Sequence, residues 1–309
     1  MLKAVILIGG PQKGTRFRPL SLDIPKPLFP VAGFPIIQHH IEACTVLKDL
    51  KEILLIGFYP TAQIENFITE MQQQHNIFIK YLQEFAPLGT AGGLFHFRDQ
   101  IRVGSPEAFF VMNGDVCADF KLQDIYEFHK SKKDKALVTI MSTEATRQQS
   151  LEYGCMVIDK DTQEVKHYVE KPSSYVSTLI NCGVYLFSPD IFQKIGEVFN
   201  SKQQDLNRNG NGCKETGYIQ LEQDILAPLA GTGRVFAVQT HNWWAQLKTA
   251  GSAIYANRHY LELYKTQHSD RLAETNSGEN KSKCVIIPDV YVHPSANIHS
   301  TSVVHGLIK

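Results

Sequence analysis

The sequence predicts an α/β protein built on a doubly wound, mostly parallel sheet. Short unbroken apolar runs of strand length recur in the first half of the chain, at residues 4–8, 53–56 and 109–112. Such runs are typical of strands that are buried on both faces of a parallel sheet. Segments with helical apolar spacing separate them, and this repeated β-α-β order places helices on both faces. We therefore expect ligands beyond the carboxyl ends of the strands.

The bulk composition limits the class of protein. The chain has 309 residues, with 31 basic and 31 acidic side chains and therefore no net charge. This balance does not favour nucleic acid as a partner. No stretch approaches the roughly 20 apolar residues of a membrane span, and the apolar N-terminus is too short for a signal peptide. The six cysteines lack metal-ligand spacing, so we expect reduced thiols in a cytoplasmic protein.

The expected elements alternate along the chain in a way that supports this fold class. Apolar residues at helical spacing predict helices at residues 36–44, 64–71, 94–101, 122–130, 219–229 and 252–264. Further strands are expected at 77–82, 136–141, 181–187 and 235–239, with a hairpin over 153–158 and 165–169. Polar residues 201–217 are expected to form a flexible insertion, and residues 266–283 a linker after a main domain over 1–265.

The first apolar run opens into a glycine-rich loop with basic side chains. Its candidate binding residues are Gly9, Gly10, Gly14, Thr15 and Arg16, followed on a stiff proline-flanked segment by Lys26. Glycines leave backbone N–H groups free to approach an anion, and a hydroxyl and two cations add further donors. The pattern indicates a phosphate-binding loop, although its spacing is neither that of a P-loop nor that of a dinucleotide fold. A tight turn with surface charges remains the alternative interpretation.

Two later loops also follow strands and carry ligand-binding chemistry. Gly89 and Thr90 lie in a glycine-rich loop after the strand at 77–82, where backbone groups can approach a planar base. Asn113 and Asp115 close another strand, and a carboxylate there suits Mg²⁺ held together with substrate phosphates. A plain glycine-rich connection and an Asx turn are the respective structural alternatives.

Four segments together resemble the signature of the sugar-nucleotide pyrophosphorylases, which join a sugar 1-phosphate to a nucleoside triphosphate and release pyrophosphate. These segments are Gly9-Gly10, Gly14-Thr15-Arg16, Arg18-Pro19-Leu20 and Pro25-Lys26-Pro27-Leu28. Later segments point more narrowly to the alpha, regulatory-type subunit of GDP-mannose pyrophosphorylase, or mannose-1-phosphate guanylyltransferase. The resemblance implies a Rossmann-like nucleotidyltransferase fold over residues 1–265.

The resemblance also implies a role for each candidate residue. Arg16 and Lys26 would act on the phosphates as catalytic residues, and Asp115 would be a ligand of Mg²⁺. The nucleotide would contact the loop glycines and Thr15, and further along Gln83, Gly89, Thr90 and Asn113, with Gln83 reading the edge of the base. The sugar phosphate would bind Gly154, Glu170, Lys171 and Asn181. Without the resemblance, Glu170 and Lys171 would be an ordinary exposed charge pair.

Two departures from the family pattern affect the phosphate and metal chemistry. Residues 11–13 lengthen the glycine loop by two residues, and Pro11 has no N–H group to donate. Gln246 occupies the position of the family's second metal-binding carboxylate, and a neutral amide offsets no charge. We therefore expect Mg²⁺ binding that is weak or dependent on the substrate. The segments for the base and the sugar match the family pattern.

The C-terminal residues repeat with a period of six. Ile286, Val292, Ile298 and Val304 fall at that strict spacing, which predicts the start of a left-handed parallel β-helix over residues 284–309. Members of the family carry many such coils, so we expect a C-terminally shortened domain. A single coil buries its apolar face poorly without a neighbour.

Three functions are compatible with these patterns. The first is an active mannose-1-phosphate guanylyltransferase. The second is a regulatory sensor that binds GDP-mannose, or GTP and mannose 1-phosphate, in a hetero-oligomer with a catalytic subunit. The third is a non-catalytic assembly subunit. We favour the second because both departures strike the phosphate and metal chemistry, whereas random loss would damage the base and sugar segments alike.

Overall fold

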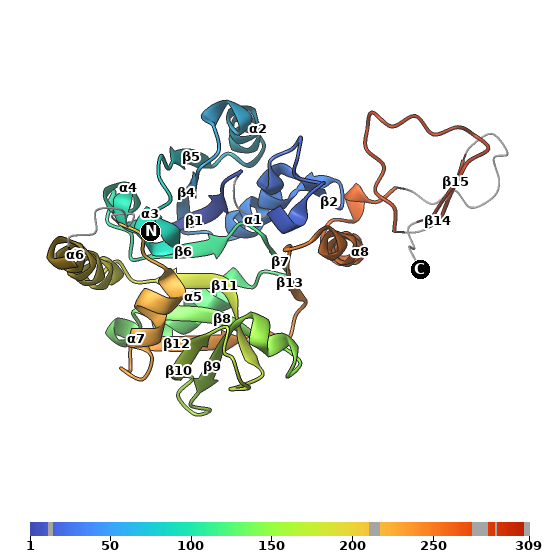
Figure 1. The fold of residues 1–309 in the computed structure, drawn as a ribbon. Helices are drawn as coiled ribbons and strands as arrows, with labels where there is room; N and C mark the ends of the chain where they lie inside the picture. The colour runs from blue at the N-terminus through green and yellow to red at the C-terminus, as the bar shows by residue number, and fades with distance from the viewer. Residues whose placement is uncertain (12–14, 210–216, 274–283, 288, 306–309) are drawn as a thin grey trace.

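A nine-stranded sheet crosses the molecule and organises the rest of the chain (Figure 1). The computed structural model describes residues 1–309 apart from 12–14, 210–216, 274–283, 288 and 306–309. Gly14, one of the predicted nucleotide-binding residues, therefore lies outside the described residues. The strand order is β10-β9-β11-β6-β1-β4-β5, with β8 also pairing with β11 and β12 pairing with β8.

Four parallel strands form the part of the sheet that the apolar runs predicted. They are β5 (Phe78–Gln83), β4 (Leu50–Gly57), β1 (Leu2–Gly9) and β6 (Ala108–Asn113). β1 lies between β4 and β6 and pairs with both in parallel. Its apolar side chains are buried on both faces, since Ala4 and Ile6 pack in one core cluster and Val5 in the other. The interpretation of such runs as strands buried on both faces is confirmed for β1.

A second group of strands extends the sheet. β11 (Leu179–Phe187) pairs antiparallel with β6, with β8 (Val138–Glu144) and with β9 (Gly154–Ile158). β12 (Val235–Gln239) pairs parallel with β8, and β10 (Val165–Glu170) pairs antiparallel with β9, as the predicted hairpin requires. Within the described sheet, β10 and β11 are therefore antiparallel to the other seven of the nine strands. The prediction of a mostly parallel sheet is confirmed.

The sheet divides at β11, and this division positions the candidate site. β8 pairs along one edge of β11 at both of its ends. The other edge is shared, because β6 pairs with residues 184–187 and β9 with Ile180. Gly183 lies at the division with a positive φ of 73°, and an added Cβ there would meet the side chain of Asn113. The carboxyl end of β6 and the start of β9 thus border a common space.

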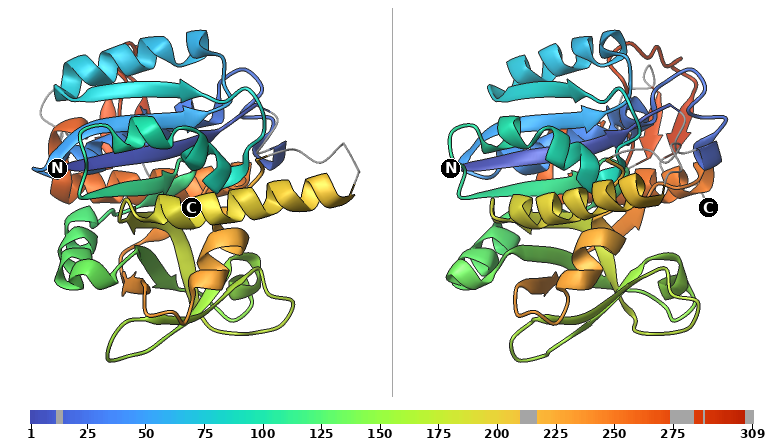
Figure 2. Two further views of the ribbon diagram at one scale, coloured as in Figure 1. Left: turned by 90° about the vertical axis from the view of Figure 1, so that its left-hand side faces the viewer. Right: turned by 60° about the vertical axis from the view of Figure 1, so that its left-hand side comes forward.

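Helices cover both faces of the sheet, as expected for a doubly wound fold (Figure 2). One face carries α1 (Ile36–Thr45), α2 (Glu65–His75) and α5 (Leu122–Ser131), preceded in the chain by the small hairpin β2 (Pro30–Val31) and β3 (Phe34–Pro35). The other carries α3 (Gly89–His96), α4 (Arg98–Arg102), α6 (Ile191–Asn209) and a π-helical turn, Leu221–Leu226, that continues into α7 (Ala227–Leu229). Among the described helices, none is both long and apolar enough to cross a membrane.

The insertion predicted at residues 201–217 is wrong in its first part. Helix α6 continues through Asn209, and residues 210–216 lie outside the described part of the chain. The helix begins with an apolar face whose Phe192 and Ile195 are buried. Once a helix is nucleated, each further residue is added at little cost even when the sequence is polar. The polar composition therefore marked the later turns of a helix rather than a loop.

The helix predicted from Leu94 begins earlier, at Gly89. A distant segment fixes this first turn: Ala91 N donates to Ile219 O at 3.0 Å, and Ile219 N donates to Leu88 O at 2.9 Å. An added Cβ at Gly89 would clash with the backbone of Ile219. The glycines here permit two backbone segments to pack closely, which local sequence alone did not indicate.

The C-terminal region begins with residues packed on the main domain. Helix α8 (Ala250–Gln267) is followed by a 3₁₀ turn at Ser269–Arg271. The guanidinium of Arg271 donates to both carboxylate oxygens of Glu42 on α1, at 3.0 and 2.7 Å. The start of the predicted linker at 266–283 is thus ordered against the main domain, while the domain boundaries themselves stay a prediction.

Two short strands near the C-terminus pair with each other. β14 (Val285–Ile287) and β15 (Val303–His305) are parallel, and Ile286 lies opposite Val304. These partners are 18 residues apart (304 − 286), or three repeats of six. The β-helix start over residues 284–309 stays a prediction.

Candidate functional site

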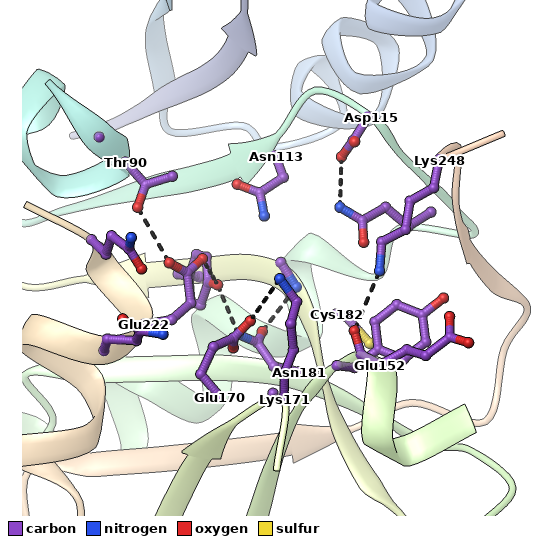
Figure 3. Close-up of a pocket in the computed structure, with 18 of the residues that line it drawn as sticks. Thr90, Asn113, Asp115, Glu152, Glu170, Lys171, Asn181, Cys182, Glu222 and Lys248 are labelled. Carbon is purple, nitrogen blue, oxygen red and sulfur yellow. Dashed lines mark hydrogen bonds and ion pairs between the residues drawn. The ribbon is translucent and has the colours of Figure 1, made fainter. Parts of the chain in front are cut away.

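A polar pocket of about 410 Å³ opens where the sheet divides (Figure 3). It draws its lining from segments that are far apart in the sequence. Eleven of the predicted site residues line it, namely Arg16, Lys26, Gly89, Thr90, Asn113, Asp115, Gly154, Glu170, Lys171, Asn181 and Gln246. The structure thus brings the two cations of the glycine loop region and the candidate metal ligand to one hollow, as the sequence suggested.

Four predicted nucleotide-binding residues do not line this pocket. They are Gly9, Gly10, Thr15 and Gln83. The two glycines turn the end of β1 against Phe58, whose N–H donates to the first of them at 2.7 Å. The side-chain oxygen of Gln83 accepts a hydrogen bond from the Thr61 hydroxyl at 2.9 Å. Their roles in binding a nucleotide stay predictions.

Asp115 anchors one end of the pocket, which we call the phosphate end. Its residues are Arg16, Lys26, Asp115, Gln246 and Lys248. Lys26 Nζ lies 2.9 Å from one carboxylate oxygen of Asp115, and the amide nitrogen of Gln246 donates to the other oxygen at 3.0 Å. The short strands β7 (Val116–Ala118) and β13 (Trp244–Gln246) pair antiparallel, with Gln246 opposite Val116. This pairing places the amide beside the carboxylate.

The groups around Asp115 do not suit a Mg²⁺ ion held by the protein. Mg²⁺ requires oxygen ligands that present lone pairs, whereas both carboxylate oxygens of Asp115 face N–H donors of Lys26 and Gln246. The lysine ammonium also stands where a cation would approach the carboxylate. The described residues contain no group of three or more His, Cys, Asp or Glu side chains that is placed to hold a metal ion.

Lys248 is a pocket residue that the sequence reasoning missed. Its Nζ lies 3.9 Å from the centre of the Tyr153 ring and 3.5 Å from the backbone oxygen of Glu152. Burial, reinforced by the positive charge of Lys171, lowers the pKa of the Lys248 ammonium. The available signal was its position only two residues after the predicted site residue Gln246.

The other end of the pocket, which we call the sugar end, is built from a hydrogen-bonded network. Its residues are Thr90, Gly154, Glu170, Lys171, Asn181 and Glu222. The buried amide of Asn181 donates to the hydroxyls of Tyr168 and Tyr185, at 2.9 and 2.8 Å. Tyr168 donates to Glu170 at 3.1 Å. Burial raises the pKa of both tyrosines well above its ordinary value, so both hydroxyls remain protonated.

A glycine and a lysine complete this wall. Gly154 begins β9, and an added Cβ there would clash with the Tyr168 hydroxyl and the Glu170 carboxylate. Lys171 Nζ lies 3.5 Å from the other oxygen of Glu170 and is 64% exposed. Glycine is therefore required for the carboxylate to reach its place, while the lysine stays free to meet a ligand.

Glu222 closes the sugar end from the π-helical turn, and it was also missed. One of its oxygens accepts from the Thr90 hydroxyl at 3.3 Å and the other from Tyr185 at 3.4 Å. The Thr90 hydroxyl oxygen in turn accepts from Leu221 N at 2.8 Å. Burial raises the pKa of Glu222, and the charge of Glu170 acts in the same direction. Thr90 and Glu222 are 132 residues apart, so no local pattern could have joined them.

The core supports the floor of the pocket between these two ends. Figure 3 shows Asn113 between Asp115 and Lys248 on one side and Thr90 on the other. The backbone oxygen of Asn113 lies 3.2 Å from Nε2 of the fully buried His40. Burial lowers the pKa of this histidine. His40 is thus a buried core residue whose ring nitrogens both have backbone partners.

Comparison with known proteins defines the class. A family model described as nucleotidyl transferase matches residues 3–216. A solved structure of UDP-glucose pyrophosphorylase complexed with UDP-glucose shares the fold with a TM-score of 0.67 and 19% identity, over 85% of this chain and 99% of that chain. The chain belongs to the nucleotidyl transferase family.

Curated relatives narrow the grouping. A Drosophila melanogaster protein named mannose-1-phosphate guanylyltransferase regulatory subunit alpha is 61% identical over 306 residues, which cover 94% of this chain and 70% of the relative. A Xenopus laevis protein named mannose-1-phosphate guanyltransferase alpha-A is 56% identical over 299 residues, which cover 96% of this chain and 70% of that relative. Within the family, the chain groups with these alpha subunits, and the predicted resemblance is confirmed.

Proposed function

We propose that this chain binds GDP-mannose in the pocket and regulates GDP-mannose synthesis in the cytoplasm, with weak or no catalysis of its own. One contrast within the pocket carries the proposal. At the sugar end, hydrogen bonds connect Asn181, Glu170 and Glu222 through two buried tyrosines. At the phosphate end, the carboxylate that should meet a metal is instead paired with Lys26 and Gln246.

The sugar end supports binding of a sugar phosphate. Glu170 and Glu222 offer carboxylate oxygens to sugar hydroxyls, and Lys171 offers an ammonium to a phosphate. Gly89 and Thr90, which we expect to flank the base, border the same pocket. The choice of mannose and guanine, and the binding of GTP with mannose 1-phosphate, rest on the family resemblance and on the relatives' names.

Weak catalysis is expected from the phosphate end. Nucleotidyl transfer depends on positioning and on stabilising charge at the phosphates, much of which a bound Mg²⁺ supplies in related chemistry. With Gln246 in place of a carboxylate and Lys26 on Asp115, this chain's residues would leave such an ion to be held by the substrate. Loss of one preorganised charge-stabilising group typically costs about 10²–10³ in rate.

A catalytic partner completes the proposed role. The Drosophila relative carries the words regulatory subunit in its name, and a regulator of this kind acts through another chain. We therefore place this chain in a hetero-oligomer with a catalytic pyrophosphorylase subunit, to which it communicates whether GDP-mannose is bound.

An active mannose-1-phosphate guanylyltransferase is the second candidate, because Arg16, Lys26 and Lys171 all line the pocket. These are the cations that the family pattern assigns to the phosphates. A non-catalytic assembly subunit is the remaining alternative, and it predicts no affinity for GDP-mannose.

Calorimetry combined with a mixing assay tests the proposal. GDP-mannose titrated into this chain alone should bind saturably. Addition of the chain to a catalytic homologue should then change the homologue's rate in a manner that depends on GDP-mannose. Absence of binding would favour the assembly subunit, and binding without an effect on the homologue would contradict regulation.

A further inference from the structure

Lys248 brings a positive charge to the phosphate end that its neighbours do not neutralise. Lys26 is paired with Asp115, and Lys171 lies 3.5 Å from Glu170. Among the described residues, by contrast, no carboxylate lies within ion-pair distance of Lys248. Its ammonium donates a long hydrogen bond of 3.5 Å to a backbone oxygen, which is a weak interaction. Donors therefore remain available for a ligand.

The position of this ammonium is set by its surroundings. Tyr153 lies beneath Nζ at 3.9 Å, and its ring packs edge-on against Trp244 of β13. Such a cation–π contact favours a fixed place for the charge. Leu247, the preceding residue, is fully buried, whereas Gln246 and Lys248 on either side of it both line the pocket. Figure 3 shows Lys248 and Asp115 at the same end of the pocket.

We propose that Lys248 binds the phosphates of the ligand and, together with Lys26, takes the place of a divalent cation, so that nucleotide binding by this chain does not require Mg²⁺. The inference rests on the proposed function, since it assigns a role within the same pocket. It concerns binding and leaves catalysis aside.

Charge and geometry favour this assignment over a structural role for the lysine. A Mg²⁺ ion would bring two positive charges to the diphosphate. Lys248 brings one that no described carboxylate within ion-pair distance offsets, and Lys26 adds a second ammonium whose charge Asp115 partly offsets. The ammonium of Lys26 already occupies the approach to Asp115 at 2.9 Å, and an ammonium donates directly to phosphate oxygens. The ammonium of a lysine that serves only in packing normally pairs with a carboxylate or extends into solvent. Lys248, by contrast, is half-buried in the pocket wall.

The test is calorimetric titration of GDP-mannose into the full chain, in Mg²⁺ buffer and in EDTA. Wild-type Kd should agree within about threefold between the two buffers, well under the tenfold that 1.4 kcal/mol represents. Lys248→Met keeps the aliphatic stem over Tyr153 but removes the charge, and it should weaken binding in EDTA by about tenfold or more, as expected for a lost charge-assisted hydrogen bond. Lys248→Arg should retain most of the affinity.

Lys132→Met is the matched control. Lys132 also lies over an aromatic ring, at 4.7 Å from the centre of Phe128, and donates to a backbone oxygen at 3.0 Å, but it lies outside the pocket. It should bind like wild type.

The outcomes separate the two levels of the proposal. No binding in either buffer would overturn the proposed function itself. Binding that requires Mg²⁺ would overturn this inference and leave the function standing. Wild-type affinity of Lys248→Met in EDTA would remove Lys248 from the phosphate site. If that variant does not fold, Lys248→Gln, which also removes the charge, takes its place in the same titration.

Discussion

The sugar end and the phosphate end of this pocket are built on different physical principles. The sugar end connects buried neutral groups and half-buried acidic groups from β10, β11 and the π-helical turn through hydrogen bonds of 2.8–3.4 Å. The phosphate end places charged side chains from loops beside Asp115, whose side chain is 28% exposed. A buried network loses its value if one member is left unpaired. Partly exposed charges tolerate exchange more easily because solvent screens them.

This difference predicts that substitutions are tolerated more easily at the phosphate end than at the sugar end. Gln246, which the resemblance places at the position of the second metal-binding carboxylate, donates to Asp115 at 3.0 Å, so no charge is left unpaired there. An apolar substitution at Asn181 would remove the donor to two buried tyrosine hydroxyls and the acceptor of the Gly183 N–H. The comparison predicts large effects at the sugar end and smaller, metal-dependent effects at the phosphate end.

The largest effect is expected from Asn181→Leu. The substitution keeps the branched shape of the side chain but leaves the hydroxyls of Tyr168 and Tyr185 and the N–H of Gly183 without this partner. Urea unfolding should report a loss of about 1–3 kcal/mol, and affinity for GDP-mannose should fall as well. Asn200→Leu, on an exposed position of α6, should change stability by less than about 0.5 kcal/mol. Equal effects of the two variants would refute the network.

A Cβ at the start of β9 should act mainly on the ligand. Gly154→Ala forces the Glu170 carboxylate and the Tyr168 hydroxyl to move, so GDP-mannose affinity should weaken about tenfold, or 1.4 kcal/mol. Gly251→Ala is the control, because an added Cβ in this turn of α8 meets nothing within 4 Å. It should bind normally and be slightly more stable. Unchanged affinity of Gly154→Ala would place the sugar elsewhere.

The phosphate end should gain metal dependence from Gln246→Asp. Two carboxylates side by side repel each other, so the variant should lose about 1 kcal/mol of stability without metal. Added Mg²⁺ should recover that loss because a ligand of the native state stabilises it. The control is Gln246→Asn, which has the size of the aspartate variant but no charge. Its thermal unfolding temperature should not change with Mg²⁺, and neither should that of the wild type. A wild-type response as large as that of Gln246→Asp would contradict our account of this end.

The smallest effect is a difference in pH dependence. Burial raises the pKa of Glu222 above its ordinary value of 4.5, so between the unfolded and the native pKa the native protein holds a proton that the unfolded chain has released. Its contribution to stability is complete below the unfolded pKa and is lost as the pH rises through the native pKa. Glu222→Gln should remove this decline, as measured by denaturation at several pH values upward from 4.5. Glu152→Gln should keep the wild-type dependence of stability on pH. The same dependence in the wild type and in both variants would contradict a raised pKa of the Glu222 carboxyl.

Much of the fold could be predicted because its signals are local. The apolar run of β1 and the alternation of β9 and β10 each depend on neighbouring residues, and both were found in the structure. The later turns of α6 were missed because their residues are polar. The composition of a helix beyond its packed face carries little information about its length.

The site was predicted in part for the same reason. Segments with a family pattern located Asp115 and Glu170, which do line the pocket. Glu222 and Lys248 were missed because each enters the pocket through contacts made by distant segments, the first with Thr90 and the second with Tyr153. Such partners become neighbours only once the sheet divides at β11.

One sample that is assayed for both binding and turnover tests the central claim most directly. The chain alone should bind GDP-mannose saturably, yet with GTP, mannose 1-phosphate and Mg²⁺ it should release pyrophosphate at least about 10²-fold more slowly than the ordinary enzyme rate near 10 s⁻¹. Turnover near 10 s⁻¹, or the absence of any GDP-mannose binding, would contradict it.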